Sequence, residues 1–428
     1  MYQKTTLDNG IRVVTEHLPH VRSVALGFWF GVGARHEDAG TSGLSHLIEH
    51  LMFKGTAKRS ARQIAEEFDA TGGQLNAYTS KEYTCYYARV LDRHLPMATE
   101  VLADMVLHSR FAPEDLEKEK GVVQEEIKMY EDSPDEMVHD LFTQAILGGH
   151  PLGRTILGTA ETVSRFTRED LLTHLERHYT PDNLVVAAAG HAEHAAVVAE
   201  VECHFRDFRG RRTAEEAPAP AASPKPVLRA KETEQVHLCL GVEGLKRGDP
   251  RKYALFTLDV ILGGGMSSRL FQELREERGL VYSTYSYHVC YRETGLFAIY
   301  AGMSPHNADE VVDLVKREFA RLAAEGVGAE ELRRAKEQLK GSLVLSLEST
   351  ASRMSRIAKS ELFDERYDTP DELVAKVDAV TAADVNALAA ELLAEPRVAL
   401  AAIGPWGPGA KGAEGSEGAP AGGAAPSR

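Results

Sequence analysis

The chain is poor in cysteine, in aromatic side chains and in basic charge. Its 428 residues include four cysteines, two tryptophans and 7% aromatic residues, and the formal net charge is −15. Cys85, Cys203, Cys239 and Cys290 show no paired spacing, so they predict reduced thiols and neither a disulfide framework nor a cysteine metal site. A nucleic-acid partner needs a basic face, and an acidic chain gives no reason to expect one.

Long apolar segments are also missing. No run approaches the roughly 20 apolar residues that cross a bilayer, so we expect no membrane partner. Residues 1–6 contain neither the apolar segment of a signal peptide nor an Arg/Ser-rich transit sequence. The length predicts a large enzyme-sized chain of about two or three domains. We therefore expect a cytoplasmic protein, and a bacterial one.

Against this background, one short segment carries most of the functional information: His46-Leu-Ile-Glu49-His50. On a helix His46 and His50 share one face, and Glu49 lies beside them. Two neutral imidazoles with a neighbouring carboxylate are the side chains of a catalytic zinc site, because the nitrogens bind metal and the carboxylate can accept a proton from water. The order His-x-x-Glu-His is the inverted form of His-Glu-x-x-His. The alternative is an amphipathic helix with two surface histidines.

The flanking residues predict a helix over 44–53. Thr41 and Ser42 can cap its start, and Gly55 can end it. The apolar positions give this helix one side that can be buried. They are Leu44, Leu47, Ile48, Leu51 and Met52.

A third ligand is expected in a second helix, over 113–132. Glu126 has apolar residues one turn before it and one turn after it, whereas Glu125 lies between Gly121 and Lys128 on a solvated face. A carboxylate on an apolar face is costly, and metal coordination compensates for that cost. Glu119, two turns earlier on nearly the same face, could orient a metal ligand. The alternative is a charged surface helix whose glutamates have no common role.

With these residues in place, the chain resembles the pitrilysin-like M16 metallopeptidases (inverzincins), and most closely the branch of the mitochondrial processing peptidase. The family motif is His-x-x-Glu-His followed by a ligand Glu roughly 75 residues later, which His50 and Glu126 match. Further matching segments cover roughly residues 3 to 405. They include residues 7–14, 31–35, 53–56, 72–79, 150–153, 179–183, 264–271 and 274–282.

The resemblance implies roles for particular residues. One Zn²⁺ per subunit would be held by His46, His50 and Glu126, with Glu49 as the base; manganese or cobalt would suit the same ligands. Family members place an Arg and a Tyr seven residues apart against the substrate carbonyl, which Arg275 and Tyr282 match. The alternative places Arg275 in a surface ion-pair cluster and Tyr282 at the start of a strand.

Substrate binding is implied as well. The family pairs an extended peptide with an edge strand, and Asn76, Ala77 and Tyr78 match those positions. The alternative is an ordinary internal strand. Because this chain carries both the zinc motif and the Arg/Tyr pair, we expect a homodimer in which Arg275 and Tyr282 of one subunit serve the zinc of the other.

The predicted fold class is α+β, with two homologous domains that each pack helices on a mainly antiparallel sheet (LuxS/M16 metallohydrolase-like). The expected domains are residues 1–208 and 228–405, joined by a Pro/Ala-rich linker at 209–227 and followed by a disordered Ala/Gly/Pro-rich tail at 406–428. The predicted function is zinc-dependent hydrolysis of unfolded peptides or processing segments inside a dimeric chamber. The alternatives are a noncatalytic scaffold of the same fold and a heterodimer with an inactive paralogue.

Overall fold

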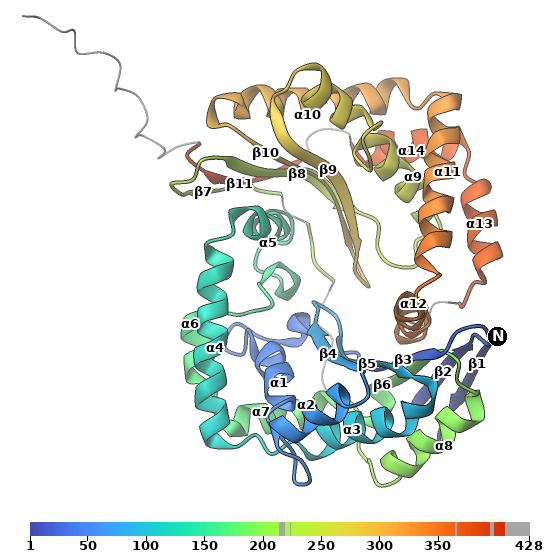
Figure 1. Ribbon diagram of the computed structural model, residues 1–428. Coiled ribbons are helices and arrows are strands. Elements are labelled where there is room, and N and C mark those ends of the chain that lie inside the picture. The colour runs from blue at the N-terminus through green and yellow to red at the C-terminus, as the bar shows by residue number, and fades with distance from the viewer. Residues whose placement is uncertain (214–218, 223, 364–365, 394–397, 407–428) are drawn as a thin grey trace, which may run out of the picture.

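The computed structural model describes residues 1–213, 219–222, 224–363, 366–393 and 398–406. Two halves, each a sheet with helices, face one another (Figure 1). The predicted disordered tail lies outside the described residues except at its first residue, Trp406, whose indole Nε1 donates a 3.2 Å hydrogen bond to Asp309 Oδ1. Residues 214–218 and 223 of the predicted linker also lie outside them.

The first half contains a six-stranded sheet in the order β1-β2-β6-β3-β5-β4, in which only β2 and β6 run parallel. Alternating and β-branched residues form these strands, and β4 lies at the free edge. The strands are β1 (Tyr2–Thr6), β2 (Arg12–His17), β3 (Ser23–Phe30), β4 (Gln74–Thr79), β5 (Thr84–Leu91) and β6 (Leu184–Gly190).

The second half repeats this plan with five strands in the order β7-β11-β8-β10-β9, in which only β7 and β11 run parallel. Its free edge, β9, corresponds in position to β4. The strands are β7 (Val227–Ala230), β8 (Val236–Gly244), β9 (Val281–Cys290), β10 (Gly295–Met303) and β11 (Ala399–Gly404). The predicted α+β fold with two similar halves is confirmed.

Helices cover both sheets, and among the described residues none is long and apolar enough to cross a membrane. In the first half they are α1 (Leu44–Met52), α2 (Ala61–Asp69), α3 (Leu95–His108), α4 (Pro113–Glu131), α5 (Pro134–Leu147), α6 (Ala160–Arg165), α7 (Arg168–His178) and α8 (His194–Phe205). In the second half they are α9 (Lys252–Leu262), α10 (Ala308–Glu325), α11 (Ala329–Ser346), α12 (Thr350–Leu362), α13 (Pro370–Asp378) and α14 (Ala382–Leu392).

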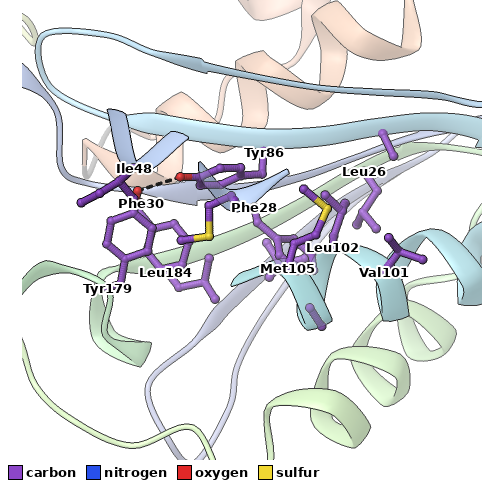
Figure 2. Close-up of a cluster of buried hydrophobic side chains, with 14 of the residues drawn as sticks. Leu26, Phe28, Phe30, Ile48, Tyr86, Val101, Leu102, Met105, Tyr179 and Leu184 are labelled. Carbon is purple, nitrogen blue, oxygen red and sulfur yellow. Dashed lines mark hydrogen bonds between the residues drawn. The ribbon is translucent and has the colours of Figure 1, made fainter. Parts of the chain in front are cut away.

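The main core of the first half anchors α1 against the sheet. Figure 2 shows Ile48 of α1 beside Phe30 and Tyr86 of the sheet, and all three side chains are fully buried. The hydroxyls of Tyr86 and Tyr179 lie 2.9 Å apart, which satisfies both polar groups inside this core. Aromatic side chains of this size exclude water and fix the helix relative to the strands.

Each sheet receives a helix from the other half on its second face. Helix α5 packs on β8 and β11 of the second sheet, and α12 packs on β2, β3 and β6 of the first (Figure 1). At the α12 contact, Trp29 Nε1 donates a 3.2 Å hydrogen bond to Met354 Sδ, and both side chains are buried. This exchange of helices was not predicted from sequence, and it makes each half's packing depend on the other.

Candidate metal centre and substrate edge

Helix α1 begins at Leu44, and the carboxylate of an upstream residue accepts hydrogen bonds from the backbone at its start. The predicted capping by Thr41 or Ser42 is wrong: the N-cap is Gly43, with φ 96° and no side-chain cap. A Cβ at this position would lie 2.6 Å from Leu157 O, so the turn requires glycine. The carboxylate of Glu37 instead accepts hydrogen bonds from Gly43 N at 2.8 Å and Ser45 N at 2.7 Å. A carboxylate at a helix N-terminus also complements the helix dipole.

The helix ends at Met52, one residue earlier than predicted, and Phe53 is its C-cap. All five apolar positions expected on its inner side are buried. His46 and His50 lie on the opposite side as neighbours, with ring centroids 4.6 Å apart. Burial and then the neighbouring His50 lower the pKa of His46 to about 3. The imidazole of His46 is therefore neutral, which is the form that binds a metal.

Helix α4 brings Glu126 to these two rings. Its Oε2 lies 3.6 Å from Nε2 of His46 and 3.6 Å from Nε2 of His50. The apolar surroundings expected for Glu126 are found only in part: Val123 is fully buried, but Val122 is 48% exposed and Met129 is 71% exposed. The Glu126 side chain itself is 43% exposed, so it does not lie on a buried face. Glu125 is solvated as expected and pairs with Lys128 at 2.7 Å.

The three side chains fit a zinc ion. Among the described residues, the one group of three or more potential ligands is His46, His50 and Glu126, whose ligand atoms lie within 4.8 Å of one another. Two atoms that each bind one zinc ion at its usual tetrahedral distances lie about 3.4 Å apart, close to the observed spacing. His46 Nδ1 is buried without a hydrogen-bond partner among the described residues. The other ring nitrogen of His46, Nε2, is the one that contacts Glu126.

Glu119 is placed to orient His50. Its carboxylate is buried, with Oε2 3.2 Å from His50 Nδ1 and Oε1 2.8 Å from Lys54 Nζ. A carboxylate at Nδ1 directs the imidazole so that Nε2 faces the ligand cluster. The ammonium of Lys54 compensates the buried charge of Glu119.

Glu49 lies beside the ligand cluster and contacts the edge strand β4. The hydroxyl of Thr79 donates a 2.6 Å hydrogen bond to Glu49 Oε2. Burial raises the pKa of Glu49, while the Thr79 hydrogen bond and His50 oppose that rise. A carboxylate with a raised pKa is a stronger base than an exposed one, which suits proton transfer near neutral pH.

The segment expected to bind substrate forms β4, which pairs only with β5 within the described residues and leaves its other edge open. The alternative of an internal strand is therefore wrong. Ala77 faces the α1 side of the sheet with the main core, whereas Tyr78 packs on the α12 side, 5.9 Å from the ring of Trp29. Asn76 is exposed and accepts a 2.8 Å hydrogen bond from Ala77 N.

Arg275 and Tyr282 lie in the second half, away from the ligand cluster. Arg275 belongs to the π-helical segment η5 (Phe271–Glu277), and Tyr282, 74% exposed, lies at the start of β9. The Arg275 guanidinium lies 5.8 Å from the Tyr282 ring centroid. No hydrogen bond or ion pair among the described residues joins either side chain to Glu49 or the ligands. The alternative ion-pair cluster around Arg275 is absent from the described residues, where Glu273 pairs with Arg278 at 2.7 Å.

The sequence did not reveal the roles of three residues at or near this site. Thr79 was part of the expected strand, but its contact with Glu49 was not predicted. The available signal was that Thr79 shares a strand face with Leu75 and Ala77. Arg35 and Glu82 were also missed: Arg35 Nη1 lies 2.6 Å from Glu82 Oε1 and 2.7 Å from Glu293 Oε2 of the second half. This buried cluster ties the β4–β5 turn to the second half.

Two family models match successive parts of the chain. Residues 12–160 match the family model described as insulinase (peptidase family M16), and residues 165–339 match the one described as peptidase M16 inactive domain. A Bacillus subtilis (strain 168) protein named "uncharacterized zinc protease YmxG" is 48% identical over 405 residues, covering 95% of this chain and 98% of the relative. The chain belongs to peptidase family M16.

A second relative and two solved structures are also similar to this chain. The "uncharacterized zinc protease SCO5738" of Streptomyces coelicolor is 45% identical over 411 residues, 94% of this chain and 89% of the relative. A solved protease from Helicobacter pylori shares the fold with a TM-score of 0.86 at 23% identity, covering 95% of this chain and 99% of that one. Chains of complex III2 from Candida albicans share it too, with a TM-score of 0.82 at 23% identity and coverage of 94% and 95%. The names of the Bacillus and Streptomyces relatives describe both of them as zinc proteases.

Proposed function

We propose that this M16 protein is a zinc-dependent endopeptidase that cleaves unfolded peptides. The observation that carries the proposal is the position of Glu49. It lies next to the ligand cluster without being one of its three members, and it is hydrogen-bonded to the edge strand that would hold a substrate. A base, a metal site and a peptide-pairing edge therefore meet at one place.

His46, His50 and Glu126 would hold the metal, and Glu119 would keep the His50 imidazole in its binding orientation. When bound there, zinc supplies Lewis-acid chemistry that polarises the scissile carbonyl and lowers the pKa of water. Glu49 accepts a proton from the attacking water and later donates it to the leaving amine. The Thr79 hydroxyl holds the Glu49 carboxylate in position for both transfers.

The open edge of β4 would bind the substrate backbone. A peptide added beside β4 makes main-chain hydrogen bonds that do not depend on its side chains. The peptide must be extended, so folded proteins are poor substrates. In this arrangement Asn76, Ala77 and Tyr78 contact the peptide from the strand.

The remaining part of the proposal is a homodimer. Arg275 and Tyr282 are exposed and lie away from their own subunit's ligand cluster, so we assign them to the zinc site of a partner subunit. There they would donate hydrogen bonds to the oxyanion that develops on the carbonyl. Two such subunits would enclose a chamber. We also propose that the enzyme acts in the bacterial cytoplasm.

Cleavage of a quenched peptide of about 15 to 20 residues tests the central proposal. Wild type should cleave it, and a chelator should stop the reaction. Glu49→Gln should keep its zinc because Glu49 is not a ligand, yet lose activity by about 10² to 10⁴-fold. His46→Gln should lose both zinc and activity. A wild type that binds no zinc, or binds zinc and cleaves nothing, would contradict the proposal.

Mixing two inactive variants tests the dimer. If Arg275 serves the partner's zinc, a dimer of one Glu49→Gln subunit and one Arg275→Ala subunit contains one intact site. Random exchange of subunits should then restore about a quarter of wild-type activity. If Arg275 acts within its own subunit, the mixture stays inactive. Light scattering that finds only monomer in an active preparation would also defeat the homodimer.

The fold likeness to chains of complex III2 favours one alternative, a noncatalytic scaffold. A scaffold needs neither a cluster of potential metal ligands nor a carboxylate beside it, and this chain has both. A scaffold would keep its stability when zinc is removed and would cleave no peptide. In a heterodimer with an inactive paralogue, cleavage would require the second protein.

A further inference from the structure

A cavity of about 500 Å³ opens beside β4 on the face opposite the ligand cluster. Tyr78 of β4 and Tyr87 of β5 line it from the sheet, and residues of α12 together with Ser346 line it from the second half. The volume exceeds that of one side chain and is within the range of ligand pockets. Because α12 comes from the other half, the cavity exists only where the two halves meet.

The lining of this cavity is basic in a strongly acidic protein. It contains Lys359 and Arg356, three serines, two tyrosines and no carboxylate, although the chain has a net charge of −15. Arg356 is already engaged, since Nη2 lies 3.5 Å from Glu16 Oε2 and 3.1 Å from the Tyr367 hydroxyl. The positive charge that remains available comes from Lys359.

Lys359 is half-buried and lacks a counter-charge. Its ammonium lies 5.2 Å from the Tyr83 ring centroid and makes no ion pair with any residue that the structure describes. A half-buried ammonium loses part of its hydration, and a cation–π contact of this kind restores only a small part of that loss. The carboxylate of a bound peptide would compensate the lost hydration of the Lys359 ammonium better.

Strand geometry directs substrate side chains toward this cavity. Along β4, Asn76 pairs with Tyr87 and Tyr78 pairs with Cys85, so these residues share the α12 face. Leu75 and Ala77 take the α1 face instead. A peptide added to the edge of β4 alternates in the same way, so every second side chain points to the α12 face.

We propose that this cavity is a substrate side-chain site that selects an acidic residue, aspartate or glutamate, through Lys359. The assignment rests on the proposed function, because it needs a peptide paired with β4. The tyrosine rings would contact the methylene groups of the acidic side chain, and the serine hydroxyls at the rim would donate to its carboxylate. The peptide residues on either side, which face α1, would not share this preference.

Binding and cleavage of matched peptides test the proposal separately. At each position around the scissile bond in turn, a peptide with glutamate is compared with a peptide that has its uncharged isostere, glutamine. Binding is measured by fluorescence anisotropy with the Glu49→Gln variant, which would not consume the peptide, and kcat/KM is measured with wild type. We expect the glutamate peptide to be favoured about tenfold in both measurements, at one position or at two positions separated by one residue. An effect of about tenfold lies between those of exposed and buried ion pairs.

Lys359→Gln should bring this ratio close to one, and Lys359→Glu should reverse it. Lys316→Gln, on the exposed face of α10, removes the same charge elsewhere and should leave the ratio unchanged. Equal binding of both peptides at every position, or a preference that survives Lys359→Gln, would overturn the proposal. Selective binding without cleavage by wild type would instead overturn the endopeptidase function and leave the acidic-residue site standing.

Discussion

The hydroxyl of Thr79 donates a 2.6 Å hydrogen bond to Oε2 of Glu49. This contact joins the last residue of the edge strand β4 to the carboxylate beside the ligand cluster. Movement of the strand would therefore move the proposed base. Binding a peptide along β4 and positioning Glu49 are thus mechanically linked.

Replacing Thr79 by valine keeps the shape of the side chain and removes this hydrogen bond. Loss of a hydrogen bond to a charged group lowers kcat about tenfold or more, and KM should change little because the substrate does not contact this hydroxyl. Thr79→Ser restores the donor and should recover most of the activity. Zinc content, measured by atomic absorption, should be the same in all three proteins. Full kcat in Thr79→Val would show that Glu49 needs no such support.

Glu119→Gln should weaken zinc binding about 10- to 100-fold, because His50 loses the carboxylate that orients it. Competition with a chelator of known affinity measures this change. Glu125→Gln is the matched control, since Glu125 lies on the same helix but its side chain is exposed and paired with Lys128. Equal zinc affinity in the two variants would argue against an orienting role for Glu119.

The pH dependence of stability should reflect His174, which is buried on α7 with Nε2 3.3 Å from Ser45 Oγ. Burial lowers the pKa of His174 to about 3 from its ordinary value of 6.5. Below pH 6.5 the unfolded chain binds a proton that folded His174 does not, so stability falls as the pH falls toward 3. At pH 5.5 this one group lowers the free energy of unfolding by about 1.2 kcal/mol relative to pH 7.

Urea unfolding at neutral pH and at pH 5.5 measures that loss in wild type and in His174→Gln. The variant should lose less stability on acidification, by about the 1.2 kcal/mol attributed to His174. His108→Gln, at an exposed position at the end of α3, should follow wild type. If the stability of His174→Gln and of wild type depended on pH in the same way, the pKa of His174 would not be depressed.

Arg35→Met should destabilise the protein by about 2–3 kcal/mol, because Glu82 and Glu293 lose the guanidinium that they share, while Glu82 keeps a 3.5 Å contact with Arg247. Urea unfolding of the zinc-loaded protein measures this loss. Arg62→Met removes an exposed ion pair with Glu66 and should change stability by less than about 1 kcal/mol. Similar effects of the two substitutions would mean that the cluster between the halves contributes little.

Several local features were predictable because short-range patterns determine them. The helices predicted over 44–53 and 113–132 each differ by one residue from α1 and α4. Periodic apolar residues and turn residues specify such elements locally. The capping of α1 was not predictable in this way, because Glu37 reaches the helix from outside it.

The sequence by itself determined that His46 and His50 share one helix face, since their spacing does so in any α-helix. It also determined two similar α+β halves, through the repeated order of apolar strands and amphipathic helices. The tertiary structure alone decided that Thr79 supports Glu49, that α5 and α12 cross to the opposite sheets, and that Lys359 lies beside β4. Contacts between residues far apart in the chain depend on how the sheets and helices pack, and local periodicity carries no record of that packing.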